Sequence, residues 1–488
     1  MCKWIVDADQ IQIKDLDNRT LYRNDVVDSF VYNDRKLGIE APKGLGKTYL
    51  MKCKRMVSQQ QGILCLPQDA MCDILDKVTF EESMSKYLED YVNWVDLWKT
   101  AICISVHKAC IQDAELEGIL ISTIKSANNV NDELYLNIYY NPFLVTVCQI
   151  MNLLINSERS LVRAMQTRIP FYMAIVKQIR QPVHIFIDKT DQALRDNLHY
   201  INGASRMSRG PSNNSYWSYG QLALAEAAYQ IFIQNPHIKV FYSIRSEALV
   251  GAEGYTNLFL QLRSYMVKLE YDYYELKQMF EHYISIEDDK WLVSPDYRSS
   301  DPAKSFVGIS DIEHGYVKND TGKYEIEPVF RYIYRHSLKR PRDIMHICYR
   351  LCYSQLKVLD SDISRKKEIR HVVNQESRLL LQSYIREMGP FVFDGNEEKW
   401  DFFWKTIDTN VFTYTYAQEI CALVNASTEE TVCVKMCDKC LAFKPFSALF
   451  NTGLLGVIRR NNVEGDAKTI HFQPTGQTII QTNEEIVP

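Results

Sequence analysis

Residues Lys36–Leu50, with the sequence KLGIEAPKGLGKTYL, decide how the rest of the chain is interpreted. A short apolar stretch leads into a glycine-rich turn, and Lys47 and Thr48 open a predicted helix. Gly44 and Gly46 allow the backbone to curl so that successive N–H groups point at phosphate oxygens. The start of the helix adds the positive end of its dipole. The stretch therefore predicts a phosphate-binding loop, in which Lys47 reaches the β- and γ-phosphates and the Thr48 hydroxyl ligates Mg²⁺.

The loop departs from the motif G-x-x-x-x-G-K-[ST] at its first position, where the chain has Ala41. Alanine is tolerated there if its φ is ordinary, since the later glycines make the tight turn. The alternative, a Gly-Lys-Thr in a surface turn, stays open on this stretch alone. The residues expected to contact the nucleotide are Lys43, Gly44, Leu45, Gly46, Lys47, Thr48 and Tyr49.

The totals describe a folded protein of more than one domain. The chain has 488 residues, 46% apolar and 24% charged, which is too long for a single core. Its net charge of −5 gives no overall attraction to nucleic acid or an anionic membrane. The start of the chain has no signal-peptide pattern, and the longest apolar run, near Phe143–Ile155, is too short to span a bilayer. The 13 scattered cysteines favour a reducing compartment, and we expect a cytoplasmic protein without membrane contact.

A second strand is predicted within Pro182–Leu194, PVHIFIDKTDQAL. The apolar run ends in Asp188, at the carboxyl end of a buried strand, where ligands bind in open α/β sheets. We expect Asp188 to lie on the Mg²⁺ side of the site, and Asp191 to orient or deprotonate the attacking water. Alternatively, Asp188 caps a helix and Asp191 is a solvated loop acid.

A third strand is predicted within Ile238–Leu249, IKVFYSIRSEAL. It places Ser243 and Arg245 near its carboxyl end, where a polar residue and an arginine are poor core material. Both residue types are expected at this position if they face a γ-phosphate. The alternative is that Arg245 forms a surface ion pair with Glu247.

Helical spacing dominates the remaining chain. Residues 69–125 and 142–179 are predicted to be mainly helical, with Trp94, Leu97, Trp98 and Ile102 as a core stripe. Residues 287–326 are polar, contain Pro and Gly, and are predicted to be an irregular linker.

Residues 327–386 turn helical again and include a basic stretch. Residues 331–350 hold six Arg or Lys against one acid, Asp343. Pro341 suits the first turn of a helix, so Arg340 and Arg342 would lie at a helix start. Cations there oppose the dipole and need an anion, which could be a nucleotide phosphate, a nearby carboxylate or nucleic acid.

The last hundred residues are expected to form a separate unit. Three helices, near residues 399–407, 416–425 and 445–449, are followed by strand, turn and strand within residues 453–476, a pattern typical of a winged helix. Six basic residues against six acidic ones in residues 430–488 give only weak support for DNA binding. Cys433, Cys437 and Cys440 have spacing that can hold a metal, but they would also share one face of a helix as small core residues.

The order APKGLGKT, IFIDKTD, FYSIRSEA, LKRPRD and a winged-helix-like end resembles the AAA+/STAND branch of P-loop ATPases, including origin-recognition-like and bacterial defence-associated ATPases. The resemblance implies an α/β fold: a P-loop core with a parallel sheet flanked by helices (residues 1–286), a linker and helical lid (287–386) and a winged-helix-like domain (387–488). It implies that Lys47 and Thr48 are the Walker A pair and Asp188 the Walker B acid. Arg245 would follow the sensor strand, and Arg342, or alternatively Arg340, would be the arginine of the lid.

The resemblance implies an ATPase switch that uses ATP and Mg²⁺, forms oligomers and signals with a partner protein in bacterial defence or stress. Lys189 stands where many such ATPases have a second acid beside the Walker B aspartate, so Asp191 is the remaining base and slow hydrolysis is expected. The alternatives are a DNA-binding or DNA-loading ATPase and a nucleotide-binding scaffold without turnover. A metalloprotein built on the cysteine cluster ranks last.

Overall fold

The computed structural model divides the chain into two compact units, residues 1–291 and 292–488, and each is described by itself. The expected end of the core, residue 286, lies close to this division, and the expected boundary after residue 386 stays a prediction. The structure describes residues 2–4, 7–16, 18–66, 69–70, 82–111, 117–118, 132–144, 146–190, 214–250, 256–318, 324–388, 397–406, 416, 419–420, 423, 456–460, 468–472 and 485–487.

Unit 1 is built on a parallel β-sheet with the strand order β2-β4-β5-β1-β6. β3 also pairs in parallel with β4, farther along the edge that β2 occupies, so β2 and β3 line the same side of β4. The short β1 is central, between β5 and β6, and all its residues are buried. The strands are β1 (Gly38–Glu40), β2 (Leu64–Cys65), β3 (Asp69–Ala70), β4 (Val183–Asp188), β5 (Ile238–Ile244) and β6 (Met266–Lys268).

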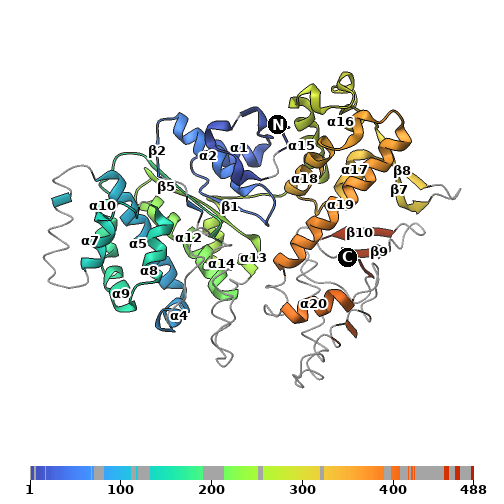
Figure 1. Cartoon of the computed structure of the whole chain (residues 1–488). Helices are drawn as coiled ribbons and strands as arrows, with labels where there is room; N and C mark the ends of the chain where they lie inside the picture. Colours follow the sequence, from blue (N-terminus) through green and yellow to red (C-terminus); the bar gives the residue numbers. More distant parts are fainter. Residues whose placement is uncertain are drawn as a thin grey trace. The chain divides into compact units, whose positions relative to one another are not determined.

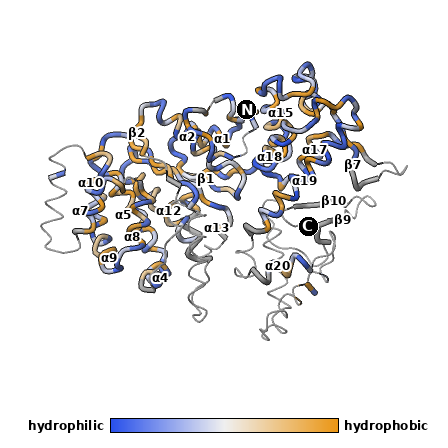
Figure 2. The backbone as a smooth tube through the Cα atoms, viewed as in Figure 1, coloured by the Kyte–Doolittle hydropathy of each residue, from blue (hydrophilic) through white to orange (hydrophobic). Residues whose placement is uncertain are grey.

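Helices flank this sheet, with α1 and α2 on one side and α12 and α5 on the other (Figure 1). Apolar residues gather in the strands and in the helices that cover them (Figure 2). Unit 1 contains the α-helices α1 (Asp25–Tyr32), α2 (Lys47–Gln60), α4 (Glu82–Leu88), α5 (Tyr91–Cys110), α7 (Asp132–Tyr140), α8 (Val147–Ile155), α9 (Arg159–Gln166), α10 (Ile169–Val176), α12 (Asn214–Gln234), α13 (Ser246–Val250), α14 (Thr256–Arg263) and α15 (Tyr273–Ile286), and the short 3₁₀ helices η1 (Ala8–Gln10), η2 (Ile13–Asp15), η3 (Asn18–Thr20) and η5 (Asp289–Trp291).

The predicted core stripe on α5 is confirmed. Trp94, Leu97, Trp98 and Ile102 are at most 1% exposed, and the Trp98 indole donates to the carbonyl of Gly220 on α12. His107, farther along α5, is fully buried, and burial lowers its pKa to about 4.

The middle of α2 is anchored to the sheet by a partly buried ion cluster. Lys54, which is 1% exposed, donates to Asp34 at 2.6 Å, and Lys239 of β5 pairs with the other oxygen of Asp34 at 3.1 Å. Burial alone would raise the pKa of Asp34, but the hydrogen bonds and charges of the two lysines lower it overall. The cluster fixes α2 over the amino half of the sheet.

Unit 2 is mostly helical. Residues 287–326 were expected to be irregular, and this prediction is wrong: they include a helix and most of an antiparallel β-hairpin. The elements of unit 2 are η6 (Pro295–Tyr297), α16 (Pro302–Val307), β7 (Asp311–Lys318), β8 (Tyr324–Pro328), α17 (Val329–Arg335), α18 (Pro341–Cys352), η7 (Gln355–Val358), α19 (Asp362–Met388), α20 (Glu397–Thr406), β9 (Gly456–Arg460), β10 (Lys468–Phe472) and β11 (Glu485–Val487).

The expected strand–turn–strand near the end of the chain appears as the antiparallel pair β9 and β10, to which β11 adds a third strand. The winged-helix assignment itself stays a prediction. Within the described part of the chain, no helix combines the length and apolar character needed to cross a bilayer.

Candidate functional site

The glycine-rich turn between β1 and α2 has the backbone that the sequence predicted. Gly44 and Gly46 have φ values of 88° and 94°, in the left-handed region that favours glycine. Gly46 is the N-cap residue of α2, which begins at Lys47. Ala41 is fully buried and is not among the described residues with positive φ, so the missing first glycine leaves the turn unstrained.

The Lys47 side chain folds back over this turn. Its ammonium donates to the carbonyl oxygens of Ala41 at 2.7 Å and Pro42 at 2.9 Å. These are neutral acceptors, and an anion in the turn would compete with them for the ammonium. The other expected contact residues lie in the turn or on the first turn of α2: Lys43 and Thr48 are half-buried, Leu45 is buried, and the half-buried Tyr49 shares a hydrogen bond of 2.9 Å with the Thr20 hydroxyl.

Asp188 lies at the carboxyl end of β4, as expected, and is only 3% exposed. Its Oδ1 accepts a short hydrogen bond from the Ser243 hydroxyl of β5. Its Oδ2 is buried and has no hydrogen-bonding partner among the residues that the structure describes. A buried carboxylate with one unpaired oxygen is costly, and such an exception calls for an explanation, such as an ion that binds there.

The packing of α2 on the sheet brings Asp188 towards the start of that helix. Alternate residues of β4 face α2: His184 Nδ1 lies 2.8 Å from the Ser58 hydroxyl, and Arg55 lies over the ring of Phe186. Two residues along a strand span about 6.6 Å, the length of about four helical residues. Since α2 runs antiparallel to β4, the next residue on that face, Asp188, lies level with the first turns of α2.

The electrostatics of α2 agree with this geometry. Burial lowers the pKa of Lys52, and the Asp188 carboxylate is close enough to oppose that shift. Lys47, Thr48 and Asp188 are therefore at one edge and on one face of the sheet. The Thr48 hydroxyl and Asp188 Oδ2 are oxygen donors of the kind that Mg²⁺ prefers, so the donor set fits this ion.

Arg245 follows β5 directly and is 2% exposed. Its backbone N–H donates to the side chain of Gln221 on α12 at 2.9 Å, which fixes the end of the strand. β5 ends at Ile244 and α13 begins at Ser246, so the strand is shorter than the predicted 238–249. The contact with Gln221 joins residues 24 positions apart, and no sequence pattern predicted it. Asp191 lies outside the described residues.

Arg340 and Arg342, the two arginines expected in a lid, belong to unit 2. Arg340 is 5% exposed and forks onto the fully buried Asp343 at 2.8 and 3.1 Å, with its guanidinium 4.2 Å from the centre of the Tyr384 ring. The carboxylate of Asp343 is thus the anion that this helix start needs. Arg342 is one-third exposed and its Nε lies 3.9 Å from Asp343, so Arg342 is the more available of the two.

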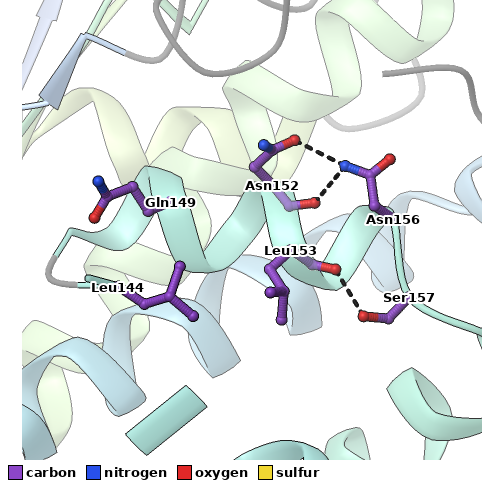
Figure 3. Close-up of a pocket in the computed structure, with 6 residues that line it drawn as sticks. All are labelled: Leu144, Gln149, Asn152, Leu153, Asn156 and Ser157. Carbon is purple, nitrogen blue, oxygen red and sulfur yellow. Dashed lines mark hydrogen bonds between the residues drawn. The ribbon is translucent and has the colours of Figure 1, made fainter. Parts of the chain in front are cut away.

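A separate surface pocket of about 390 Å³ lies along α8. Asn156 donates to the carbonyl and side chain of Asn152, and Ser157 donates to the carbonyl of Leu153 (Figure 3). Asn156 and Ser157, which directly follow α8, thus bond back to that helix, and none of the predicted site residues lines the pocket.

Cys433, Cys437 and Cys440 lie outside the described residues, so their metal binding stays a prediction. Comparison of the chain with protein-family models, with curated proteins and with solved structures gave no match.

Proposed function

We propose that unit 1 binds a nucleoside triphosphate with Mg²⁺ and hydrolyses it, as a switch of the AAA+/STAND type. The observation that carries this proposal is the buried carboxylate of Asp188, whose unpaired oxygen shares an edge and a face of the sheet with Lys47 and Thr48. Ligands of open α/β sheets bind at this edge, beyond the carboxyl ends of the strands. If Gly46, Lys47 and Thr48 formed only a surface turn, that turn would not account for a buried carboxylate with an unpaired oxygen at the same edge of the sheet.

In this proposal the glycine turn and the start of α2 bind the phosphates through backbone N–H groups. Lys47 exchanges its two carbonyl acceptors for phosphate oxygens, a stronger charge-assisted interaction. Thr48 and Asp188 hold Mg²⁺ directly or through water, and the Ser243 hydroxyl orients the Asp188 carboxylate. The bound ion neutralises charge on the β- and γ-phosphates. Arg245 is the candidate in unit 1 for stabilising charge as the γ-phosphate leaves.

Hydrolysis also needs a group that orients the attacking water. Lys189 follows Asp188 where a second acid would serve, so Asp191 is the candidate base. With a single candidate, we expect slow turnover, which suits a protein whose nucleotide state sets its conformation and its binding of a partner. ATP is the nucleotide that the resemblance implies.

Nucleotide binding is tested by thermal unfolding of the purified chain with ATP, with and without Mg²⁺. ATP with Mg²⁺ should raise the melting temperature of the wild type, and Lys47→Ala should abolish this rise. Lys177→Ala is the control, because Lys177 is an exposed lysine of the same unit. If the wild type gains no stability from ATP with Mg²⁺ at millimolar concentrations, the proposal is wrong.

Turnover is tested separately, by multiple-turnover ATP hydrolysis of the wild type, Lys47→Ala and Asp191→Ala. A wild-type rate above both variants supports the enzyme. Equal background rates in all three, together with binding by the wild type, would support the scaffold without turnover instead.

DNA binding by the basic stretch 331–350 has less support. Three of its six basic residues pair with buried carboxylates inside unit 2: Arg335 with Glu327, Arg340 with Asp343 and Arg350 with Glu376. Filter binding of duplex DNA across a salt series decides the matter, since DNA contacts would give an affinity that falls steeply with salt.

A further inference from the structure

The peptide group between Ile244 and Arg245 connects the glycine-rich turn to α12. Its carbonyl oxygen accepts a hydrogen bond of 3.2 Å from the N–H of Ala41, the residue that leads from β1 into the turn. Its N–H donates to Gln221 Oε1 of α12 at 2.9 Å. Because a peptide group is planar and trans, its C=O and N–H point in opposite directions and move together. A shift of one of these hydrogen bonds therefore shifts the other.

Gln221 supplies an acceptor that the neighbouring strand does not reach. The Arg245 N–H points away from β1, towards the side of β5 on which β4 pairs. β4 ends at Asp188, and Lys189 follows with a left-handed φ of 58°. The ladder between β4 and β5 thus stops before Arg245, and the side chain of Gln221 takes over as the acceptor there.

The position of Gln221 is itself well fixed. Gln221 is fully buried, as are residues 222–225 that follow it in α12, and a buried amide is costly unless its polar atoms are hydrogen-bonded. The indole of Trp98, a buried residue of α5, donates at 2.9 Å to the carbonyl of Gly220, the residue before Gln221. The glutamine side chain therefore extends from a point of α12 that α5 holds in place.

The connection continues to the lysine of the proposed nucleotide site. Ala41 is fully buried, and its carbonyl oxygen accepts from the Lys47 ammonium at 2.7 Å. The N–H of Ala41 is thus held by the Ile244–Arg245 peptide and its carbonyl by Lys47. We call the two hydrogen bonds from Gln221 through this peptide to Ala41 the Gln221 bridge.

We propose that Gln221 is a positioning residue, which through this bridge holds Ala41 and the start of the glycine-rich turn in the place that a triphosphate needs. This inference rests on the proposed nucleotide site. Gln221→Met keeps the length of the side chain but removes the oxygen to which the Arg245 N–H donates. The peptide then relaxes towards other acceptors and draws its carbonyl away from Ala41. Nucleotide has to restore the arrangement when it binds, and so it binds more weakly.

The test measures the Kd of the non-hydrolysable ATP analogue AMP-PNP, with saturating Mg²⁺, by isothermal titration calorimetry at a temperature where every variant is folded. Gln221→Met should raise the Kd about tenfold, which corresponds to about 1.4 kcal/mol, the size of one hydrogen bond. Hydrogen exchange of the nucleotide-free protein gives a second measurement. Gln221→Met should speed exchange at the N–H of Arg245 and also at that of Ala41, although only the former loses its acceptor directly.

Two controls separate this role from a loss of stability. Gln230→Met makes the same exchange on the same helix, where Gln230 donates only within the helix in its 2.7 Å bond to Glu226, and should leave the Kd unchanged. Asn235→Ala removes three hydrogen bonds of a buried side chain just beyond the other end of α12. It should lower the melting temperature and keep the wild-type Kd. A merely structural role of Gln221 would give the same pattern as Asn235→Ala.

Two results would overturn the inference: Gln221→Met with the wild-type Kd, or with unchanged exchange at Ala41. If Gln221→Met does not fold, the wild type decides. Because coupling is reciprocal, AMP-PNP with Mg²⁺ should slow exchange at Arg245 as well as at Ala41, and an unchanged Arg245 N–H would contradict the inference. A wild type that does not bind AMP-PNP is a different outcome: there the proposed function fails, while exchange in the nucleotide-free proteins still tests the bridge.

Discussion

Replacing Asp188 with asparagine should make the protein more stable without nucleotide while removing its response to Mg²⁺. In the structure Asp188 Oδ1 accepts from Ser243, and the buried Oδ2 has no hydrogen-bonding partner in the described part of the chain. An unsatisfied buried polar atom costs about 1–3 kcal/mol, and more if it is charged. Asparagine keeps the shape and the accepting oxygen but removes the charge.

The net gain is smaller than that cost, because the new amide N–H₂ is itself unpaired and the attraction between Lys52 and Asp188 is lost. We expect Asp188→Asn to add about 1 kcal/mol to the free energy of unfolding, or about 2 °C in melting temperature for a unit of this size. Ser243→Ala should do the opposite: it removes a hydrogen bond to a charged group, worth about 1.5–3 kcal/mol.

The assay is urea unfolding followed by tryptophan fluorescence, which reports on the buried Trp94 and Trp98 of unit 1. It is run without nucleotide or Mg²⁺ on the wild type, Asp188→Asn, Ser243→Ala and the double variant. The loss of unfolding free energy caused by Ser243→Ala should be about 1 kcal/mol smaller in the Asp188→Asn variant than in the wild type. A loss of more than about 1 kcal/mol in Asp188→Asn would refute the reasoning, because it would mean that the carboxylate is well paired in the folded protein.

Three further predictions concern packing, pH and a buried ion pair. Gly38→Ala should cost about 1–3 kcal/mol in urea unfolding, because a Cβ there would lie 2.5 Å from the buried ring of Tyr242; a neutral effect would show that the ring can move. Burial holds the pKa of His107 at about 4 against an ordinary 6.5, so the unfolded chain binds the extra proton and the free energy of unfolding should fall by up to about 3 kcal/mol as pH drops from 7 to 4. His107→Phe should flatten that part of the pH dependence, and an unchanged slope would contradict it. Asp343→Ala should cost about 3–5 kcal/mol in melting experiments, because it leaves Arg340 buried without its carboxylate, and Asp343→Ala with Arg340→Met should recover part of that loss.

The parts of the candidate site that follow from local sequence were predictable. The turn of Gly44 and Gly46 and the end of β4 at Asp188 depend on backbone freedom and on short apolar runs. The hydrogen bond between Asp188 and Ser243 joins residues 55 positions apart, and the ion pair of Asp9 with Lys189 spans 180. Only the tertiary fold brings such residues together, so the polar residues before Asp25 did not indicate that Asp9 would pair with Lys189.

The wrong prediction for residues 287–326 has a different cause. Proline and glycine were taken there as signs of irregular chain, but two of them mark the ends of a helix. Asp301 caps α16 through the Lys304 N–H, Pro302 is its first residue, and Gly308 ends it with a φ of 83°. These are ordinary start and stop signals of a helix, which composition alone does not distinguish from a linker.

The ion cluster of Lys54, Asp34 and Lys239 limits how far a ligand at the start of α2 could displace that helix. That cluster ties the middle of the helix to the strands, whereas the helix begins just after two glycines with positive φ. A displacement caused by an anion at Lys47 would therefore be absorbed in the turn and passed to the loops around it. The helix itself would stay in place. A nucleotide-dependent change in hydrogen exchange should therefore be found in the glycine-rich turn and not in the last two turns of α2.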